Sequence, residues 1–335
     1  MGSPYLVLAI LNMSMAPEVA SIKELYSPSK STRYSVAVFT TRTARLKACI
    51  AALRVHQWSK NLLIFMPLLL SHQFEQWRLL ESLHAFFAFS FCASGFYIFN
   101  DLLDRDADRM HPRKAQRPFA SGVLRIRQGF ALFAACLAAA IALAWTLPLS
   151  AQMILLLYAM TALGYSAWLK QIAFVDVLIL ALLYGFRLLF GGATEGIDVS
   201  IWTLVFFAFL FFGLALIKRW AELLAISEFN GGRLPRRGYL SSHARVVSSL
   251  ARWSLYMSVA VLAFYSNSTA ATNLYKQPRL LWLACLLLFM WVRRTAHVTS
   301  KGLMADDPLL FAFKDPRSHV IAVLFAVAGA LAIGF

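Results

Sequence analysis

Long apolar segments, separated by short polar and basic stretches, recur along this chain from about residue 46 to its C-terminus. A helix needs about 20 predominantly apolar residues to cross a bilayer. A ninth segment is expected where the amphipathic stretch from Leu46 to Asn61 continues, as one helix, into the short apolar run from Leu62 to Leu70. The pattern predicts an all-α, polytopic membrane protein with about nine transmembrane helices. The other eight candidate spans lie near residues 80–100, 128–147, 150–168, 172–193, 201–217, 248–267, 279–292 and 318–335.

The composition agrees with a bilayer protein and narrows its partners. Of the 335 residues, 60% are hydrophobic and only 14% are charged, with a mean hydropathy of +0.64; soluble domains carry about 25% charged residues. The net charge of +16 does not indicate nucleic-acid binding, because the basic residues lie between apolar runs. The bilayer itself and phosphate-bearing substrates are the expected partners.

The positions of the basic residues predict the topology. With the N-terminus in the cytoplasm, 28 of the 32 Lys and Arg residues fall in cytoplasmic segments, as expected because positive charge concentrates in cytoplasmic loops. We therefore expect an integral protein of the cell (inner) membrane whose N-terminus and active site are cytoplasmic. Residues 1–45 read as a flexible cytoplasmic extension rich in Ser and Thr, without a convincing removable leader, and residues 46–335 as the transmembrane domain.

The strongest chemical signal is the segment from Asn100 to Asp108, which carries four carboxylates where the second span runs into a basic loop. On one helix, Asp101, Asp104 and Asp108 occupy positions i, i+3 and i+7 and share a face. Magnesium is bound by one or two carboxylates together with substrate phosphate oxygens. The spacing therefore predicts Asp101, Asp104 and Asp108 as Mg²⁺ ligands that hold a diphosphate ester. The plainer alternative is a solvated acidic helix end.

Basic and polar residues near the same predicted membrane face are candidate phosphate-binding groups. The first helix carries a density of polar residues that lipid would not tolerate, so we expect them to line a polar cavity open to the cytoplasm. Each basic loop can also be explained by topology alone, and a lysine at the interface can merely extend to water. The candidate substrate-binding residues are Arg54, Lys60, Asn61, Asn100, Arg117, Tyr165, Lys218, Arg219 and Glu222, with Lys170 joining Asp101 and Asp104 as a catalytic candidate.

The sequence also suggests partners or roles for acidic residues outside the Asp-rich segment. A carboxylate inside a span normally has a cationic partner, so Asp176 is expected to pair with Lys170 or Arg187. Glu222 stands four residues after Lys218 and could simply form a helical ion pair with it. The segment Asp306-Asp307-Pro308 suggests no more than a helix cap before the last span.

The motif Asn100-Asp101-x-x-Asp104-x-x-x-Asp108 resembles the first aspartate motif of the UbiA superfamily of intramembrane prenyltransferases. The resemblance covers roughly residues 50–335 and implies a helical membrane transferase. The family usually has a second Asp-rich motif after its sixth helix, where this chain has Lys218-Arg219-Trp220-Ala221-Glu222.

The pattern is most similar to the branch that contains decaprenyl-phosphate phosphoribosyltransferase. The string from Arg54 to Asn61, the segment from Tyr165 to Lys170 and Asp306-Asp307-Pro308 carry this similarity, while Trp220 stands where a Tyr would be expected. The resemblance implies Mg²⁺-dependent transfer of 5-phosphoribosyl from phosphoribosyl pyrophosphate to a polyprenyl phosphate.

Two other functions stay open at this point. In the first, Asp101, Asp104 and Asp108 bind a polyprenyl diphosphate, an aromatic compound accepts the prenyl group, and Glu222 replaces the missing aspartate pair. In the second, Asp176 and Arg187 belong to an ion path of a transporter.

Overall fold

The computed structural model describes residues 42–110, 114–226, 234, 237–304 and 308–334. Three of the segments with sequence-based predictions lie outside these described residues. They are most of the expected N-terminal extension, the residues His111, Pro112 and Arg113 of the basic loop, and the Asp306-Asp307 pair.

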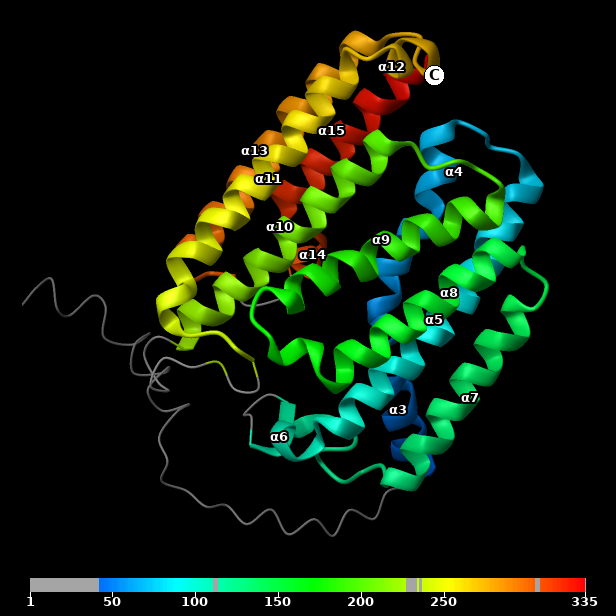
Figure 1. Ribbon diagram of the computed structural model, residues 1–335, viewed down its shortest axis with the longest axis vertical. Helices are drawn as coiled ribbons and strands as arrows, with labels where there is room; N and C mark the ends of the chain where they lie inside the picture. Colours follow the sequence, from blue (N-terminus) through cyan, green and yellow to red (C-terminus); the bar gives the residue numbers. More distant parts are fainter. Residues whose placement is uncertain (1–41, 111–113, 227–233, 235–236, 305–307, 335) are drawn as a thin grey trace, which may run out of the picture. The chain divides into compact units, whose positions relative to one another are not determined.

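The described chain folds into helices, as the apolar runs predict (Figure 1). Within the described residues, eight helices are long and apolar enough to cross a membrane, and each coincides with one of the eight apolar segments. Short elements connect or extend them. The elements are α3 (Arg42–Leu53), η1 (Val55–Phe65), α4 (Met66–Ser71), α5 (Gln76–Leu103), α6 (Arg105–Arg109), η2 (Lys114–Gln116), α7 (Ile126–Ala144), α8 (Leu149–Ala167), η3 (Leu169–Gln171), α9 (Val175–Glu195), α10 (Ile201–Ile226), η4 (Ser241–His243), α11 (Ala244–Ser266), α12 (Thr269–Leu274), η5 (Pro278–Leu280), α13 (Leu281–Ser300), α14 (Pro308–Lys314) and α15 (Pro316–Ile333).

The first apolar segment is not the single helix that its pattern predicts. α3 ends at Leu53, Arg54 adopts a left-handed backbone with φ 52° and ψ 46°, and the chain continues as the 3-10 helix η1 and then α4. A positive φ is unfavourable for a residue with a side chain. The Nε1–H of Trp58 donates to Ser94 on α5 at 2.9 Å, which helps to hold η1 after the break. The contact joins residues far apart in the sequence, so a local pattern could not predict it.

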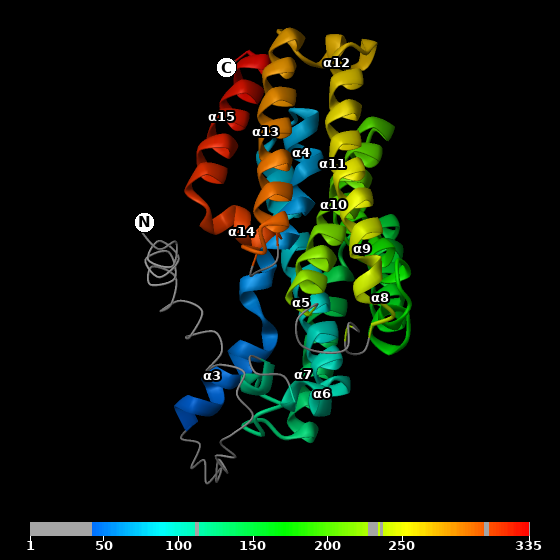
Figure 2. The ribbon, with the colours of Figure 1, turned by 90° about the vertical axis from the view of Figure 1, so that its left-hand side faces the viewer.

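Of the four hydrophobic clusters among the described residues, the two largest hold the bundle together. One lies among α5, α7, α8 and α9 and includes Phe89, Tyr158 and Phe190. The other lies among α9, α10, α11 and α13 and includes Leu216 and Leu255. In Figure 1, α11, α13 and α15 form a group beside α10, while α5, α7 and α8 lie on the other side of α9. Figure 2 shows α11, α13 and α15 from the side.

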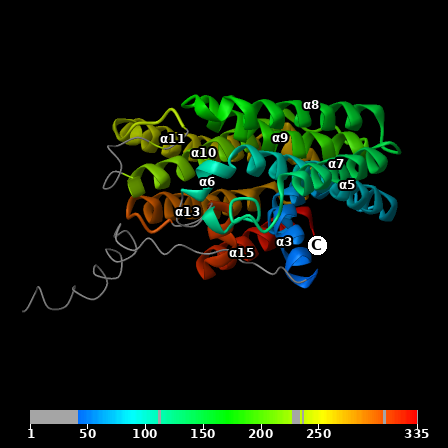
Figure 3. The same ribbon diagram turned by 90° about the horizontal axis from the view of Figure 1, so that it is seen from below.

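Antiparallel neighbours bring the polar connections to one end of the bundle. α5 packs on α7, α8 on α9, and α10 on α11. The connections within these three pairs, which include α6, η3 and η4, therefore meet at the same end, which faces the viewer in Figure 3. This end carries the Asp-rich segment.

Candidate functional site

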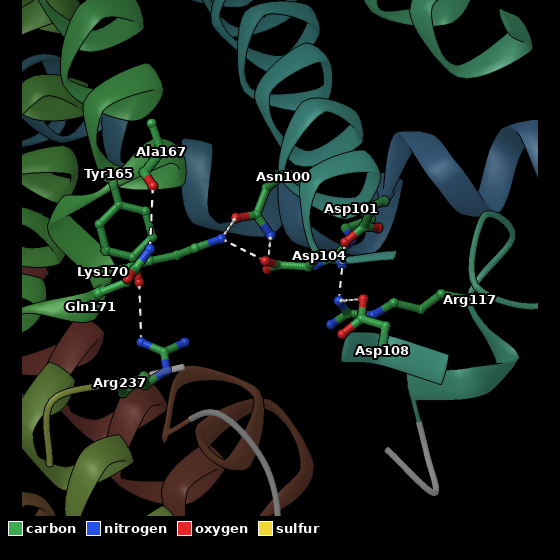
Figure 4. Close-up of polar contacts among 11 residues, drawn as sticks. Asn100, Asp101, Asp104, Asp108, Arg117, Tyr165, Ala167, Lys170, Gln171 and Arg237 are labelled. Atoms are coloured by element: carbon green, nitrogen blue, oxygen red, sulfur yellow. Dashed lines mark hydrogen bonds and ion pairs between the residues drawn. The ribbon is translucent and has the colours of Figure 1, made fainter. Parts of the chain in front are cut away.

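Two buried aspartates share one arginine at this end. Asp101 lies in the last turn of α5 and Asp108 on α6, and their side chains are 3% and 6% exposed. Nη1 of Arg117 lies 3.0 Å from Oδ1 of Asp101 and 2.6 Å from Oδ2 of Asp108 (Figure 4). Nη2 of Arg54 lies 2.5 Å from the same oxygen of Asp101. We call Asp101, Asp108 and Arg117 the acidic lobe.

Asp104 turns toward a different cation. Its Oδ1 accepts a hydrogen bond from Nζ of Lys170 at 2.8 Å, and its Oδ2 accepts one from Nδ2 of Asn100 at 3.1 Å. Nζ of Lys170 also donates to Oδ1 of Asn100 at 2.9 Å. Lys170 lies on η3, directly after α8, and its side chain is only 8% exposed. The catalytic candidates Asp104 and Lys170 are thus in direct contact.

The structure modifies the expected single aspartate face. α5 ends at Leu103 and α6 begins at Arg105, with Asp104 between them at φ −89° and ψ 0°. Asp101 and Asp108 still meet at Arg117, but Asp104 contacts Lys170 instead. Among the residues that the structure describes, no three His, Cys, Asp or Glu side chains gather as a metal-binding group. Asp106, in contrast, is exposed and pairs with Arg105 and Arg109.

A second polar cluster surrounds Asp176, at the start of α9. Oδ2 of this fully buried carboxylate lies 2.7 Å from Nε of Arg219 and 3.2 Å from Nη1 of Arg237. Its Oδ1 accepts a 2.6 Å hydrogen bond from the hydroxyl of Tyr239. The expected pairing of Asp176 with Lys170 or Arg187 is therefore wrong. The true partners come from α10 and the α10–α11 connection, which the fold brings against α9. Burial, and then the neighbouring Asp176, raise the pKa of Tyr239, which keeps its phenol protonated as the donor.

Arg219 has a structural position in this cluster. Its side chain is 0% exposed and lies between Asp176 and Glu222, with Nη1 paired to Glu222 one turn further along α10. Arg219 therefore neutralises protein carboxylates rather than presenting its charge at a surface. Lys218 is partly buried on the same helix.

The remaining candidates divide between two locations. Arg54 reaches the acidic lobe, and the hydroxyl of Tyr165 lies 3.4 Å from Nη1 of Arg237. Lys60 lies over the ring of Tyr184 at 5.9 Å. Asn61 is buried, donates to Ser90 at 2.9 Å and accepts from Nε of Arg187 at 2.8 Å. The described contacts of Lys60 and Asn61 thus connect them to the buried arginine of α9, and not to the aspartates.

Sequence reasoning missed Arg237 and Tyr239. Both lie in the connection between α10 and α11, which has no helical period, and its arginines were explained by topology alone. The hydroxyl of Tyr239 accepts the backbone N–H of Phe174 at 2.7 Å while it donates to Asp176. These two hydrogen bonds hold Tyr239 against the start of α9.

The fold and site together define an α-helical membrane protein with buried carboxylates and cations at one end of its bundle. Residues 61–314 match the model of the UbiA prenyltransferase family. The chain therefore belongs to the UbiA prenyltransferase family, and it is a transferase. This assignment is incompatible with the transporter alternative.

Three similar proteins illustrate the match. The protein y4nM of Sinorhizobium fredii is 32% identical over 86% of this chain, although the match covers only 56% of its own length. Decaprenyl-phosphate phosphoribosyltransferase of Corynebacterium glutamicum is 32% identical over 64% of this chain and 67% of its own. A UbiA homologue from Archaeoglobus fulgidus, solved with DMAPP and Mg²⁺, shares the fold with a TM-score of 0.61 at 15% identity, covering 85% of this chain and 99% of that one.

Proposed function

We propose that this chain transfers 5-phosphoribosyl from phosphoribosyl pyrophosphate to a decaprenyl-type polyprenyl phosphate and releases diphosphate. The product is a lipid-linked sugar phosphate for cell-envelope synthesis. The similarity to the corynebacterial phosphoribosyltransferase supports this substrate pair. The carrying observation is the cluster of three aspartates, in which Asp101 and Asp108 share Arg117 and Asp104 contacts Lys170. Carboxylates and cations gathered in this way suit one metal-bound diphosphate. We call the second cluster, which contains Lys218, Arg219 and Arg237 beside Asp176 and Glu222, the cationic side.

The donor atoms of the acidic lobe fit a magnesium ion. Asp101 and Asp108 supply hard carboxylate oxygens, are almost fully buried and already face one shared cation, the guanidinium of Arg117. Magnesium needs only one or two carboxylates when phosphate oxygens and water complete its shell. Asp104 is proposed as a third ligand of the same ion, although its carboxylate contacts Lys170 in the structure. The chemistry that bound Mg²⁺ supplies is neutralisation of the charge that develops on the departing diphosphate.

The chain's cations would hold the reactants in line. Arg117 and Lys170 contact the aspartates directly, so both can contact a diphosphate bound there. A phosphate oxygen of the lipid attacks the anomeric carbon of the ribose, the bond from that carbon to the diphosphate breaks, and its electron pair leaves with the diphosphate. An ionised phosphate is a nucleophile without a general base, which agrees with a site built from carboxylates and cations.

The other proposed substrate contacts follow from their positions. Arg54 contacts the acidic lobe at Asp101, whereas Asn100 contacts Asp104 and Lys170. Tyr165, Lys218 and Glu222 lie toward the cationic side. Lys60, Asn61 and Arg219 are also proposed to bind the substrates, from positions beside Tyr184, Arg187 and Asp176 respectively. We further propose that the site faces the cytoplasm from the cell membrane, as the distribution of basic residues indicates.

The test offers purified full-length protein in detergent two substrate pairs, each with Mg²⁺ or with EDTA. The first pair is labelled phosphoribosyl pyrophosphate with polyprenyl phosphate, and the second is polyprenyl diphosphate with 4-hydroxybenzoate. Metal-dependent label in a lipid phosphate is the expected result. A prenylated aromatic product, with no label transferred from the first pair, would refute the proposal in favour of ordinary UbiA-type prenyl transfer.

A further inference from the structure

A pocket of about 470 Å³ lies between α6 and the start of α7, outside the acidic lobe. Four of the side chains that line it are arginines: Arg105 and Arg109 on α6, and Arg125 and Arg127 at the start of α7. The buried ring of Phe119 gives the same pocket an apolar part. Among the described residues, no aspartate or glutamate lines it. We call it the arginine pocket.

The arginines of this pocket outnumber the carboxylates that pair with them. Asp106 forms ion pairs with both Arg105 and Arg109, at 3.0 Å and 3.3 Å, so one negative charge is shared between two positive charges. Within the described part of the chain, no ion pair joins a carboxylate to Arg125 or Arg127, and both side chains are exposed. The arginine pocket therefore carries an excess of positive charge.

Backbone hydrogen bonds hold the segment that brings α7 back beside α6. Nε of Arg109 donates to the carbonyl oxygen of Ala120 at 3.0 Å, which joins α6 to this segment. The backbone N–H of Leu124 donates to the carbonyl oxygen of Pro118 at 3.0 Å. Between them the chain turns at Gly122, whose φ of 80° favours glycine. The two walls of the pocket are thus already in place without a ligand.

The arginine pocket lies where the surface of a bilayer is expected. α7 is long and apolar enough to span a membrane, and its side chains Ile126 and Phe130 are 44% and 51% exposed beside the pocket. α3 packs in the same hydrophobic cluster as Phe119 and leaves Leu46 and Ile50 63% and 51% exposed. Figures 1 and 2 show α3 and α6 at the end of the bundle where α7 begins. Exposed apolar side chains on a helix at this position are typical of the membrane interface.

We propose that the arginine pocket binds the headgroup of an anionic phospholipid. Arg125 and Arg127 hold its phosphate, and its acyl chains lie along the exposed face of α7 at Ile126 and Phe130. Guanidinium groups bind phosphate oxygens through paired N–H donors. A zwitterionic lipid carries its own cation beside the phosphate and gains less from the excess positive charge. Topology alone places arginines on one side of the membrane, but it does not require four of them to line one pocket.

The experiment measures lipid binding to purified full-length protein in detergent. Native mass spectrometry gives dissociation constants for phosphatidylglycerol and phosphatidylcholine with identical acyl chains. Wild type should bind phosphatidylglycerol at least about tenfold more tightly, because a basic residue near an anionic headgroup contributes about fivefold. Arg125→Gln combined with Arg127→Gln should weaken phosphatidylglycerol by about ten- to thirtyfold and leave phosphatidylcholine within about twofold of wild type.

Two further double variants make the result specific. Arg245→Gln combined with Arg293→Gln removes two other exposed arginines, from the first turn of α11 and from α13. This control has the same net charge as the first double variant and should bind phosphatidylglycerol within about twofold of wild type. Arg125→Lys combined with Arg127→Lys keeps the charge and should retain part of the affinity. Because both positions are exposed, the melting temperatures without lipid should match that of wild type.

Three results would overturn the proposal. In the first, the glutamine variant at Arg125 and Arg127 binds phosphatidylglycerol within about twofold of wild type. In the second, the control at Arg245 and Arg293 loses as much affinity, so that the effect reflects overall charge. In the third, inorganic phosphate displaces phosphatidylglycerol at an equal concentration, so that the occupant is soluble phosphate. The measurement uses no substrate of the proposed reaction, so its outcome is independent of whether phosphoribosyl transfer is observed.

Discussion

Nζ of Lys170 lies 2.8 Å from Oδ1 of Asp104, although 66 positions separate the two residues in the sequence. The contact joins η3, after α8, to the junction of α5 and α6. It places a largely buried ammonium group beside the carboxylates, where a diphosphate leaving group would acquire charge. Lys170 is therefore the cation whose removal should affect the chemical step most directly.

Under the proposed function, replacing Lys170 with Met should lower kcat/KM for phosphoribosyl pyrophosphate by about a hundred- to a thousandfold, the loss typical of one preorganised electrostatic contact. Lys170→Arg, which keeps the charge, should lose less. The exposed Lys301 supplies a matched control, and Lys301→Met should behave as wild type in the same steady-state assay. Equal activity of the Lys170→Met and Lys301→Met proteins would remove Lys170 from the site.

Asp101→Asn should nearly abolish turnover and raise the Mg²⁺ concentration needed for half-maximal activity. The variant removes one of two buried carboxylates that share Arg117, and a neutral amide binds a divalent cation more weakly. We expect a loss of at least about a hundredfold. Asp106→Asn is the control, because Asp106 lies in the same motif but is exposed. Magnesium titrations that coincide for the two variants would contradict the assignment.

Asp176→Asn should destabilise the protein more than it alters the chemistry of the acidic lobe. The fully buried carboxylate faces Arg219 and Arg237 and accepts the hydroxyl of Tyr239. Loss of the anion leaves buried guanidinium charge uncompensated, at a cost of about 3–5 kcal/mol. Thermal unfolding in detergent measures the effect. The exposed Asp198 gives the comparison variant Asp198→Asn, and an Asp176→Asn protein that melts at the same temperature as this control would disprove the role.

The eight single-helix crossings were predictable because each requires only a long apolar run, which is a local property. The first segment was not, since Arg54 interrupts it with a left-handed backbone that is held by a contact to Asp101, 47 residues away. The spacing also predicted that Asp101 and Asp108 would face a common point, but not that Asp104 would turn away from them. Their partners were not, because Asp104 selects Lys170 and Asp176 selects Arg219 through tertiary packing.

The cationic side of the site was the least predictable part. Arg237 and Tyr239 lie in a connection without hydrophobic period, and a basic loop of a membrane protein is explained equally well by topology. The fold places Arg237 and Tyr239 against the start of α9, where they contact Asp176 and the backbone of Phe174. No local sequence pattern indicates these contacts.

Acid should weaken the attachment of α15 through Asp315. Hydrogen bonds from Arg294 and from Ser318 lower the pKa of Asp315 to about 2. Because the folded-state pKa lies below the unfolded value of about 4, this carboxylate contributes stability above about pH 4 and loses it as the pH falls toward 2. The difference in melting temperature between wild type and Asp315→Asn should therefore be full at pH 6 and shrink on titration from pH 4 to pH 2. A constant difference over this range would exclude the mechanism.

The contact between η1 and α9 should tolerate no side chain at Gly191. A Cβ there would lie 2.0 Å from the carbonyl oxygen of Ile64, which is backbone and cannot rotate away. Gly191→Ala should force η1 from α9, with a loss on the order of 1–3 kcal/mol or more for overpacking. Gly185 lies on the same helix with open space around its added Cβ, so Gly185→Ala should be neutral or stabilising because alanine favours the helix. Thermal unfolding of the two variants, measured side by side in detergent, separates packing from propensity. If Gly191→Ala melts at the same temperature as Gly185→Ala, the close approach of η1 to α9 at Gly191 is disproved.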